Sequence, residues 1–275
     1  MAQRYAAPYP PDMLREPLLD SGFEIWHNAP NPDDHSFQIV GSEFSQVIEL
    51  QVPPGQTITA EPGTMLFMSS GMDMDADMGG LSQGCTRCCC AGESMFRLKM
   101  LNKTGSIEKI ALTPRFPAKI VPVDMTKHDG MIFSSGAFLG AVGLDWSIDL
   151  KMVGSAATAC CGGMGLFMNV LRGRQTVFLN AGGTVLSRVL GPGEELIVDK
   201  HAILAFDATV QLEVRRTGGC MVCCCAGQGL YNAVLKGPGR VMLQSMALAK
   251  LRAAVAPAVG GSGGGGSSGD NSGGS

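Results

Sequence analysis

The residues with the most distinctive chemistry are the cysteines, which belong to one repeated phrase. It reads Cys-x-x-Cys-Cys-Cys-Ala-Gly at residues 85–92 and again at residues 220–227. A reduced form, Cys-Cys-Gly-Gly, occupies residues 160–163, and these three places hold all ten cysteines. Thiols at such spacing suggest four roles: metal ligation, S-acylation, redox chemistry, or packing in a core or interface.

A metal site would need one Cys-x-x-Cys pair from each long copy of the phrase. The four candidate ligands are Cys85, Cys88, Cys220 and Cys223. Their separation in sequence far exceeds that of a compact zinc ribbon, so the fold would have to bring the two copies together. Consecutive cysteines in a strand alternate between its faces, so a Cys-Cys-Cys run cannot bind one metal with all three thiolates.

S-acylation would use the two Cys-Cys-Cys runs at a surface. The candidate sites are Cys88, Cys89, Cys90, Cys223, Cys224 and Cys225. Stable anchoring requires two lipid signals, which two such runs would supply. Cysteine also behaves as a small buried hydrophobe, and packing is the leading interpretation of the phrase. In an intracellular chain of this length, thiols are expected rather than disulfides.

An acidic segment at residues 72–78 alternates Met or Ala with Asp and suggests a calcium loop. Such a loop needs Gly at its sixth position and Glu at its twelfth. Counted from Asp73, these positions hold Met78 and Gly84. The alternation therefore favours a half-buried strand with a solvated acidic face.

No catalytic motif emerges from the sequence. It contains no Gly-x-Ser-x-Gly, no His-Glu-x-x-His and no complete phosphate-binding glycine loop. Of the four histidines, His27 and His35 lie in or beside a Pro-rich N-terminal arm. His128 and His201 are expected in equivalent turns of successive cycles, where a histidine is more often solvated than catalytic. The residues predict a protein that is not an enzyme and has no cofactor.

Composition limits the class of partner. The formal net charge is −3 and charged residues make up 16% of the chain, which argues against a nucleic-acid-binding protein. No apolar run approaches the roughly 18 residues of a membrane-spanning helix. The N-terminus has neither the pattern of a signal peptide nor the acid-poor composition of a mitochondrial presequence. The residues alone therefore predict a cytoplasmic location.

The elements around these motifs are short strands separated by Gly/Pro turns. Alternating apolar residues at 46–52 and the turn Pro-Pro-Gly at 53–55 are typical, and no helical pattern precedes residue 245. The phrase recurs about every 65–70 residues, which predicts an all-β fold of three internal repeats. Residues 116–123 are matched with 53–60, and residues 130–136 with 63–71.

The predicted parts follow from this pattern. They are a disordered Pro-rich arm (1–35), a single all-β domain (36–247) with repeats at about 46–112, 113–183 and 184–246, a short helix (247–256), and a disordered Gly/Ser tail (257–275). An alternative for the arm is a docking segment that uses Phe23, Ile25 and Trp26.

Several motifs occur in the same order as in a known family. They are Pro-Gly-x-x-Ile-x-Ala-Glu-Pro-Gly-x-Met at 54–65, Phe-Pro-Ala-Lys-Ile-Val-Pro at 116–122, Gly-Ala-Phe-Leu at 136–139, Gly-x-Gly-Leu-Phe at 163–167, Phe-Leu-Asn-Ala-Gly-Gly at 178–183, and Gly-Pro-Gly-Arg-Val-Met-Leu-Gln-Ser at 237–245. The chain thereby resembles the altered-inheritance-of-mitochondria family (member twenty-four), which is described as similar to the tryptophan RNA-binding attenuation protein (TRAP-like).

The resemblance implies a TRAP-like sandwich of the double-stranded β-helix type that forms an oligomer or binds protein partners. It also implies no assigned enzymatic activity and, as an alternative location, the mitochondrion. The chain departs from the family in lacking a presequence and in placing cysteines where many relatives have larger apolar residues.

These features are compatible with three functions. The leading one is a non-catalytic β scaffold that self-associates or organises protein partners and supports mitochondrial organisation. The second is a small-molecule or metal-binding module. The third is an S-acylated peripheral membrane protein.

Overall fold

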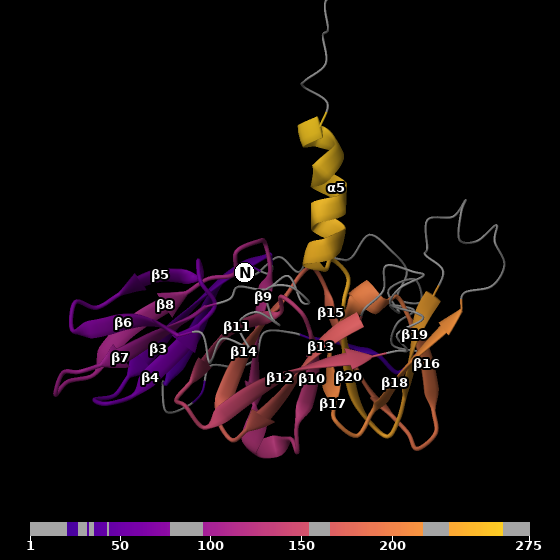
Figure 1. Cartoon of the computed structure of the whole chain (residues 1–275), viewed down its shortest axis with the longest axis horizontal. Coiled ribbons are helices and arrows are strands. Elements are labelled where there is room, and N and C mark those ends of the chain that lie inside the picture. The colour runs from indigo at the N-terminus through magenta and orange to yellow at the C-terminus, as the bar shows by residue number, and fades with distance from the viewer. Residues whose placement is uncertain are drawn as a thin grey trace, which may run out of the picture.

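The structure is a computed structural model, and it describes residues 21–26, 32, 36–42, 44–77, 96–153, 166–216 and 231–260. All ten cysteines lie outside these residues. The described chain consists of antiparallel strands, two short 3-10 turns and one helix, so the all-β prediction is confirmed (Figure 1).

Three successive sets of six strands make up the body. The first set is β3 (Ser45–Val52), β4 (Thr57–Ala60), β5 (Met65–Met68), β6 (Met72–Asp77), β7 (Arg97–Asn102) and β8 (Glu108–Leu112). The second set is β9 (Lys119–Asp124), β10 (Met131–Ser134), β11 (Phe138–Val142), β12 (Trp146–Val153), β13 (Leu166–Gly173) and β14 (Thr176–Ala181). The third set is β15 (Val185–Leu190), β16 (Glu195–Val198), β17 (Ile203–Asp207), β18 (Gln211–Arg216), β19 (Tyr231–Lys236) and β20 (Gly239–Gln244).

The three sets have the same internal pairing. In each, the first and third strands pair with the sixth, and the second and fourth strands pair with the fifth, all antiparallel. The third strand of every set also shifts register near its start, where the chain inserts an extra residue. These positions are Leu66, Leu139 and Leu204. A bulge at one place in three strands shows that their backbones bend alike.

Neighbouring sets are joined by one kind of strand pair. The second strand of a set pairs with the third strand of the next, as β4 does with β11 and β10 with β17. This pairing extends the sheets across the set boundaries and produces a six-stranded and a seven-stranded sheet. Figure 1 shows the first set at one end of the molecule, the third at the other and the second between them.

The pairing corrects the strand correspondences drawn from the sequence. Strand β9 pairs with β14 as β3 pairs with β8, so residues 116–123 correspond to the first strand of the set and not to residues 53–60. Strand β10 likewise corresponds to β4 and not to residues 63–71. Short apolar strands between Gly/Pro turns look alike in sequence, and only their partners distinguish them.

Apolar side chains that alternate along the strands fill three adjoining core clusters. Phe178 of β14 is fully buried in the cluster of the first set, and its ring meets that of Phe37 edge to face at 5.2 Å. Phe37 belongs to β2 (Phe37–Ser42), which pairs with β3 at the edge of the four-stranded sheet. The core is therefore continuous across the boundary between the first and second sets.

Part of the N-terminal arm is ordered, which corrects the expectation that residues 1–35 are disordered. Strand β1 (Glu24–Ile25) pairs with β15. Phe23 is buried beneath the guanidinium of Arg188, and Trp26 packs against the central core cluster. Residues 21–26 thus follow the docking alternative, because their apolar side chains bury more area on the sheet than in a free arm.

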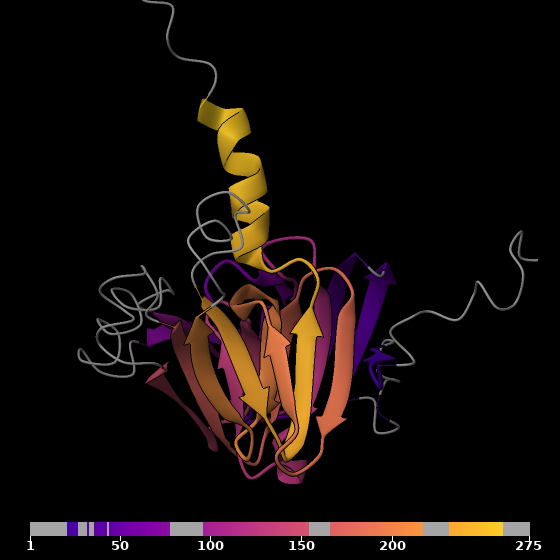
Figure 2. The same cartoon turned by 90° about the vertical axis from the view of Figure 1, so that its right-hand side faces the viewer.

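The C-terminal helix α5 spans Leu248–Gly260 and is longer than the predicted 247–256. It extends into the segment that was expected to be disordered from residue 257. Figure 2 shows it projecting away from the strands, and Lys250 near its start forms an ion pair with Asp199 at 2.9 Å. In the described part of the chain, no helix has the length and hydropathy needed to span a membrane.

Candidate functional site

A group of polar contacts lies where the second set of strands meets the third. The 3-10 turn η2 (Met125–Lys127) leads into the turn at residues 128–130, just before β10. Asp124 caps η2, and its carboxylate accepts from the backbone N–H of Thr126 at 3.0 Å and from its hydroxyl at 2.6 Å. The Thr126 hydroxyl lowers the pKa of Asp124, assisted by Lys127 against a smaller opposing effect of burial. The turn that carries His128 is thereby fixed from its N-terminal side.

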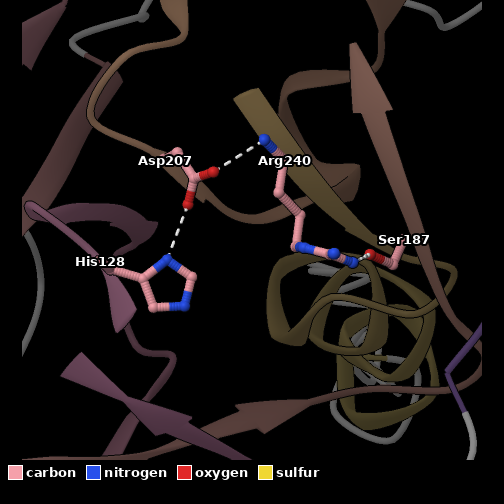
Figure 3. A network of polar contacts seen from close by, with 4 residues as sticks. All are labelled: His128, Ser187, Asp207 and Arg240. Carbon is pink, nitrogen blue, oxygen red and sulfur yellow. Dashed lines mark hydrogen bonds and ion pairs between the residues drawn. The ribbon is translucent and has the colours of Figure 1, made fainter. Parts of the chain in front are cut away.

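His128 contacts a carboxylate of the third set. Its Nδ1–H donates to Oδ1 of Asp207, at the end of β17, over 2.9 Å. The other oxygen of Asp207 accepts from the backbone N–H of Arg240 on β20 at 2.8 Å (Figure 3). Both carboxylate oxygens are occupied, so Asp207 connects the turn before β10 to two strands of the third set.

A serine completes this network without forming a catalytic triad. Figure 3 shows the side chain of Arg240 turned away from His128, and its Nη1–H donates to the buried hydroxyl of Ser187 at 2.9 Å. A triad requires the serine to be bonded to the imidazole, which would remove its proton. In this network the hydroxyl of Ser187 accepts from the guanidinium of Arg240 instead. His128 is bonded to Asp207, whose two carboxylate oxygens are both occupied.

The backbone also joins the two sets here. The N–H of Ala208 donates to the carbonyl of Gly130 at 3.1 Å. Gly239, at the start of β20, has φ +143°, and a Cβ placed there would lie 2.6 Å from Oγ1 of Thr209. Only glycine fits this approach without movement of the turn that follows Asp207. Close backbone packing therefore keeps Asp207 within reach of His128.

A cavity of about 540 Å³ opens beside His128. Its walls are Met125, Thr126, His128, Asp129, Gly130, Asp145, Arg172, Gly173 and Arg174. They come from η2 and the turn that follows it, and from the chain at the start of β12 and at the end of β13. Asp129, Asp145, Arg172 and Arg174 are all exposed at the rim. The cavity thus combines two guanidinium groups with two carboxylates in a setting open to water.

Such a cavity suits a small polar ligand that carries an acidic group. Arg172 and Arg174 form no ion pair with another described residue. Guanidinium groups bind carboxylate and phosphate through paired N–H donors. Exposure to solvent weakens each such contact, so the walls favour modest affinity.

Several residues singled out in the sequence lie outside the described chain. They are the four candidate metal ligands Cys85, Cys88, Cys220 and Cys223, the remaining candidate acylation sites Cys89, Cys90, Cys224 and Cys225, and two histidines, His27 and His35. In the described ranges, no group of three or more His, Cys, Asp or Glu side chains converges as a metal site would require. The cysteine hypotheses therefore remain predictions.

The acidic segment singled out in the sequence lies mostly within the described chain. The acidic segment forms strand β6, where Asp77 pairs with Lys99 and Asp73 with Lys103. Its apolar side is less buried than expected: Met72 is buried, but Met74 is exposed. Ion pairing with lysines on the neighbouring strand and the loop after it accounts for the charges of Asp73 and Asp77.

His201 is not the counterpart of His128, which corrects the expected equivalence. It lies in the 3-10 turn η3 (Lys200–Ala202), between the second and third strands of its set, whereas His128 lies between the first and second strands. Burial lowers the pKa of His201, and the neighbouring Lys200 lowers it further. Sequence reasoning missed Asp207 and Arg240, because an acid at a strand end and an arginine in a Gly-Pro-Gly-Arg turn carry no signal of a contact with His128.

Comparison with known proteins adds a family and a fold. Residues 37–246 match the family model described as mitochondrial biogenesis AIM24. The fold is similar to the crystal structure of a protein from Streptococcus pyogenes, with a TM-score of 0.64 and 22% identity, over 81% of this chain and 98% of that one. No curated protein matches the chain.

Proposed function

We propose that this chain, which belongs to the mitochondrial biogenesis AIM24 family, is a non-catalytic β scaffold that supports mitochondrial organisation by assembling with copies of itself or other proteins. The observation that carries the proposal is the pairing pattern, in which three six-strand sets share their internal pairs and are joined by the same strand pair. Repeated modules that stack through one kind of interface are typical of scaffolds.

The same strand-pairing pattern supports a more specific description of the all-β fold. Strands β3–β8, β9–β14 and β15–β20 coincide closely with the three repeats read from the sequence at about 46–112, 113–183 and 184–246. We therefore assign three internal repeats and a TRAP-like, double-stranded β-helix type of sandwich. No single set could bury both faces of its strands, whereas three adjoining sets share one core.

The polar network at the set junction supports a structural role for its histidine. Asp207 is bonded to His128 and to the backbone of β20, and Ser187 is bonded to Arg240. A catalytic base needs a substrate proton within hydrogen-bond reach and a partner nucleophile or electrophile. The contact of His128 with Asp207 joins the second set to the third, and the other two contacts hold strands of the third set together, which is the arrangement expected of a structural junction.

The cellular role is tested by complementation in cells from which the chain has been deleted. His128→Asn retains an N–H that can reach Asp207 but cannot act as a general base at neutral pH. We expect it to restore mitochondrial morphology and inheritance as well as the unaltered chain does. A folded, normally abundant His128→Asn protein that fails to rescue would overturn the non-catalytic proposal. Imaging of the tagged full chain tests its location in the cell, and the family leads us to expect the mitochondrion.

The cavity supports a second function, binding of a small acidic metabolite. Its two rim guanidinium groups, Arg172 and Arg174, are the observation that favours it. A ligand at 100 times its dissociation constant should stabilise the fold by about 2.7 kcal/mol. A thermal-shift screen of carboxylates and phosphate esters, repeated on the Arg172→Ala/Arg174→Ala variant, tests this function. A shift that persists in the variant would place the ligand elsewhere.

A further inference from the structure

The strand pair that joins the sets leaves one partner missing at each end of the molecule. β4 pairs with β11, and β10 pairs with β17, so a second strand meets the third strand of the following set. Among the described strands, β16, the second strand of the last set, pairs only with β19, and β5, the third strand of the first set, pairs only with β8. Figure 1 places these two strands at opposite ends of the molecule.

The free strand β5 exposes positions that its counterparts bury. The shared bulge aligns Leu66 with Leu139 and Leu204, and Phe67 with Gly140 and Ala205. All four counterparts are buried, whereas Leu66 is 54% exposed and Phe67 is 45% exposed. Large apolar residues on an open strand edge favour pairing with another strand.

The free strand β16 shows the same difference. In its register against the fifth strand of the set, Ile197 of β16 occupies the same position as Ile58 of β4 and Met131 of β10. Ile197 is 59% exposed, whereas Ile58 is 0% exposed and Met131 is 2% exposed. These two edge strands thus each carry an exposed apolar residue at a position that is buried wherever a neighbouring set is present.

The backbone of β5 is oriented to accept a partner. The N–H of Ser69 donates to the carbonyl of Lys109 on β8 at 2.9 Å. Because antiparallel strands direct alternate residues to opposite sides, the N–H of Met68 faces the open edge. Its counterpart in the second set, Ala141, lies opposite Thr59 of β4, inside the set-to-set pair.

The two existing joints fix the register that a third would have. Just beyond each pair, the N–H of Gly143 donates to Thr57 at 2.7 Å, and that of Ala208 donates to Gly130 at 3.1 Å. The alignment predicts that Ser70 would donate to the carbonyl of Leu196, with Ser69 opposite Ile197 and Met68 opposite Val198. Other outer strands do not indicate a joint in this way, since β6, β12 and β18 are outermost in their sheets in all three sets.

We propose that copies of this chain associate head to tail, β16 of one copy pairing with β5 of the next as β10 pairs with β17. The inference rests on the proposed scaffold function and names its first partner, a second copy. Each copy has one edge of each kind, so the contact is heterologous, and assembly continues until a ring closes or a filament forms.

The test is the mass of the full chain by sedimentation velocity and light scattering. Met68→Pro removes the outward N–H of β5 without touching a bond to β8, and Ile197→Lys places a charge on the β16 edge. Each variant alone should sediment at the single-chain mass of 28.7 kDa. The matched control is Val189→Lys, on β15, whose side chain is 61% exposed but whose strand is paired on both sides; it should assemble like the unaltered chain.

Mixing the two blocked variants distinguishes head-to-tail pairing from other dimers. One variant retains a free β16 edge and the other a free β5 edge, so an equimolar mixture should form a species of twice the single-chain mass and nothing larger. If Met68→Pro does not fold, as judged by circular dichroism, Phe67→Lys replaces it.

A single-chain mass for the unaltered protein at tens of micromolar would overturn the proposal, as would blocked variants that still assemble alone. Either result leaves the scaffold function standing if His128→Asn rescues cells. Failure of that rescue, with head-to-tail assembly intact, would overturn the non-catalytic function alone.

Discussion

His128 and Asp207 are 79 positions apart in the chain, yet Nδ1 of one lies 2.9 Å from Oδ1 of the other. Their contact lies next to the pairing of β10 with β17, where Met131 is opposite Asp207 itself. The hydrogen bond thus closes the end of a strand joint. A hydrophobic side chain at position 128 would leave one oxygen of Asp207 without this donor.

We expect His128→Ala to lower the free energy of unfolding by about 1–2 kcal/mol, since a partly buried hydrogen bond to a carboxylate is lost. His128→Asn should recover most of that loss. Urea denaturation at neutral pH measures both values. Equal losses for the two variants would show that the contact with Asp207 contributes nothing and that only packing matters.

The pH dependence of stability should include a contribution from His201. Burial and Lys200 lower its pKa below the ordinary value of 6.5. The folded state therefore binds the proton less readily than the unfolded chain, so stability is lost as pH falls below 6.5 and levels off below the lowered folded pKa. Melting curves between pH 8 and pH 5 should show a weaker decline for His201→Gln than for the unaltered chain.

Asp199 adds a second contribution at lower pH. Burial raises its pKa, but the hydrogen bond from the His201 backbone and the ion pair with Lys250 outweigh burial, so the pKa lies below 3.8. The stability that this carboxylate contributes is lost as pH falls through that lowered pKa. In the Lys250→Ala variant this loss of stability at low pH should be smaller. An unchanged loss would mean that the ion pair with Asp199 is too exposed to contribute to stability.

Gly239 should be intolerant of any side chain. Gly239→Ala forces a Cβ against Thr209 at a positive φ, and we expect a loss of at least about 2 kcal/mol. Gly55→Ala is the control, because Gly55 also has a positive φ but has nothing within 4 Å of the added Cβ. Its cost should be limited to the backbone strain of about 1 kcal/mol. Similar melting temperatures for the two variants would contradict the close approach.

The cysteine phrases are tested chemically. If they pack in a core or interface, the purified full chain should hold no stoichiometric zinc and no added acyl mass, and all ten thiols should react after denaturation. Zinc that is lost in the Cys85→Ser/Cys88→Ser variant would establish the metal site instead. A hydroxylamine-sensitive mass increase would establish acylation.

Local pattern was a good guide to the elements and a poor guide to their partners. Alternation at residues 46–52 predicted a strand, and the structure forms β3 there. The match of residues 116–123 with 53–60 was wrong, because both are apolar segments beside a Pro-containing turn, and nothing in them specifies pairing with β14 or with β7. The arm was misread for a related reason: Phe23 and Trp26 find their apolar surface on a sheet that forms from distant residues.

Local sequence is sufficient to predict the all-β class, the spacing of the turns and the recurrence of a motif set, because each of these depends on neighbours within a few positions. The remaining features depend on contacts between distant segments. Tertiary structure determined that His128 meets Asp207, that Ile58 is covered while Ile197 is open, and that β5 and β16 lack a joining partner within the described chain. Strand pairing is a contact between distant segments. The side chains of a strand indicate that the strand will be buried, but they do not indicate which other strand will pair with it.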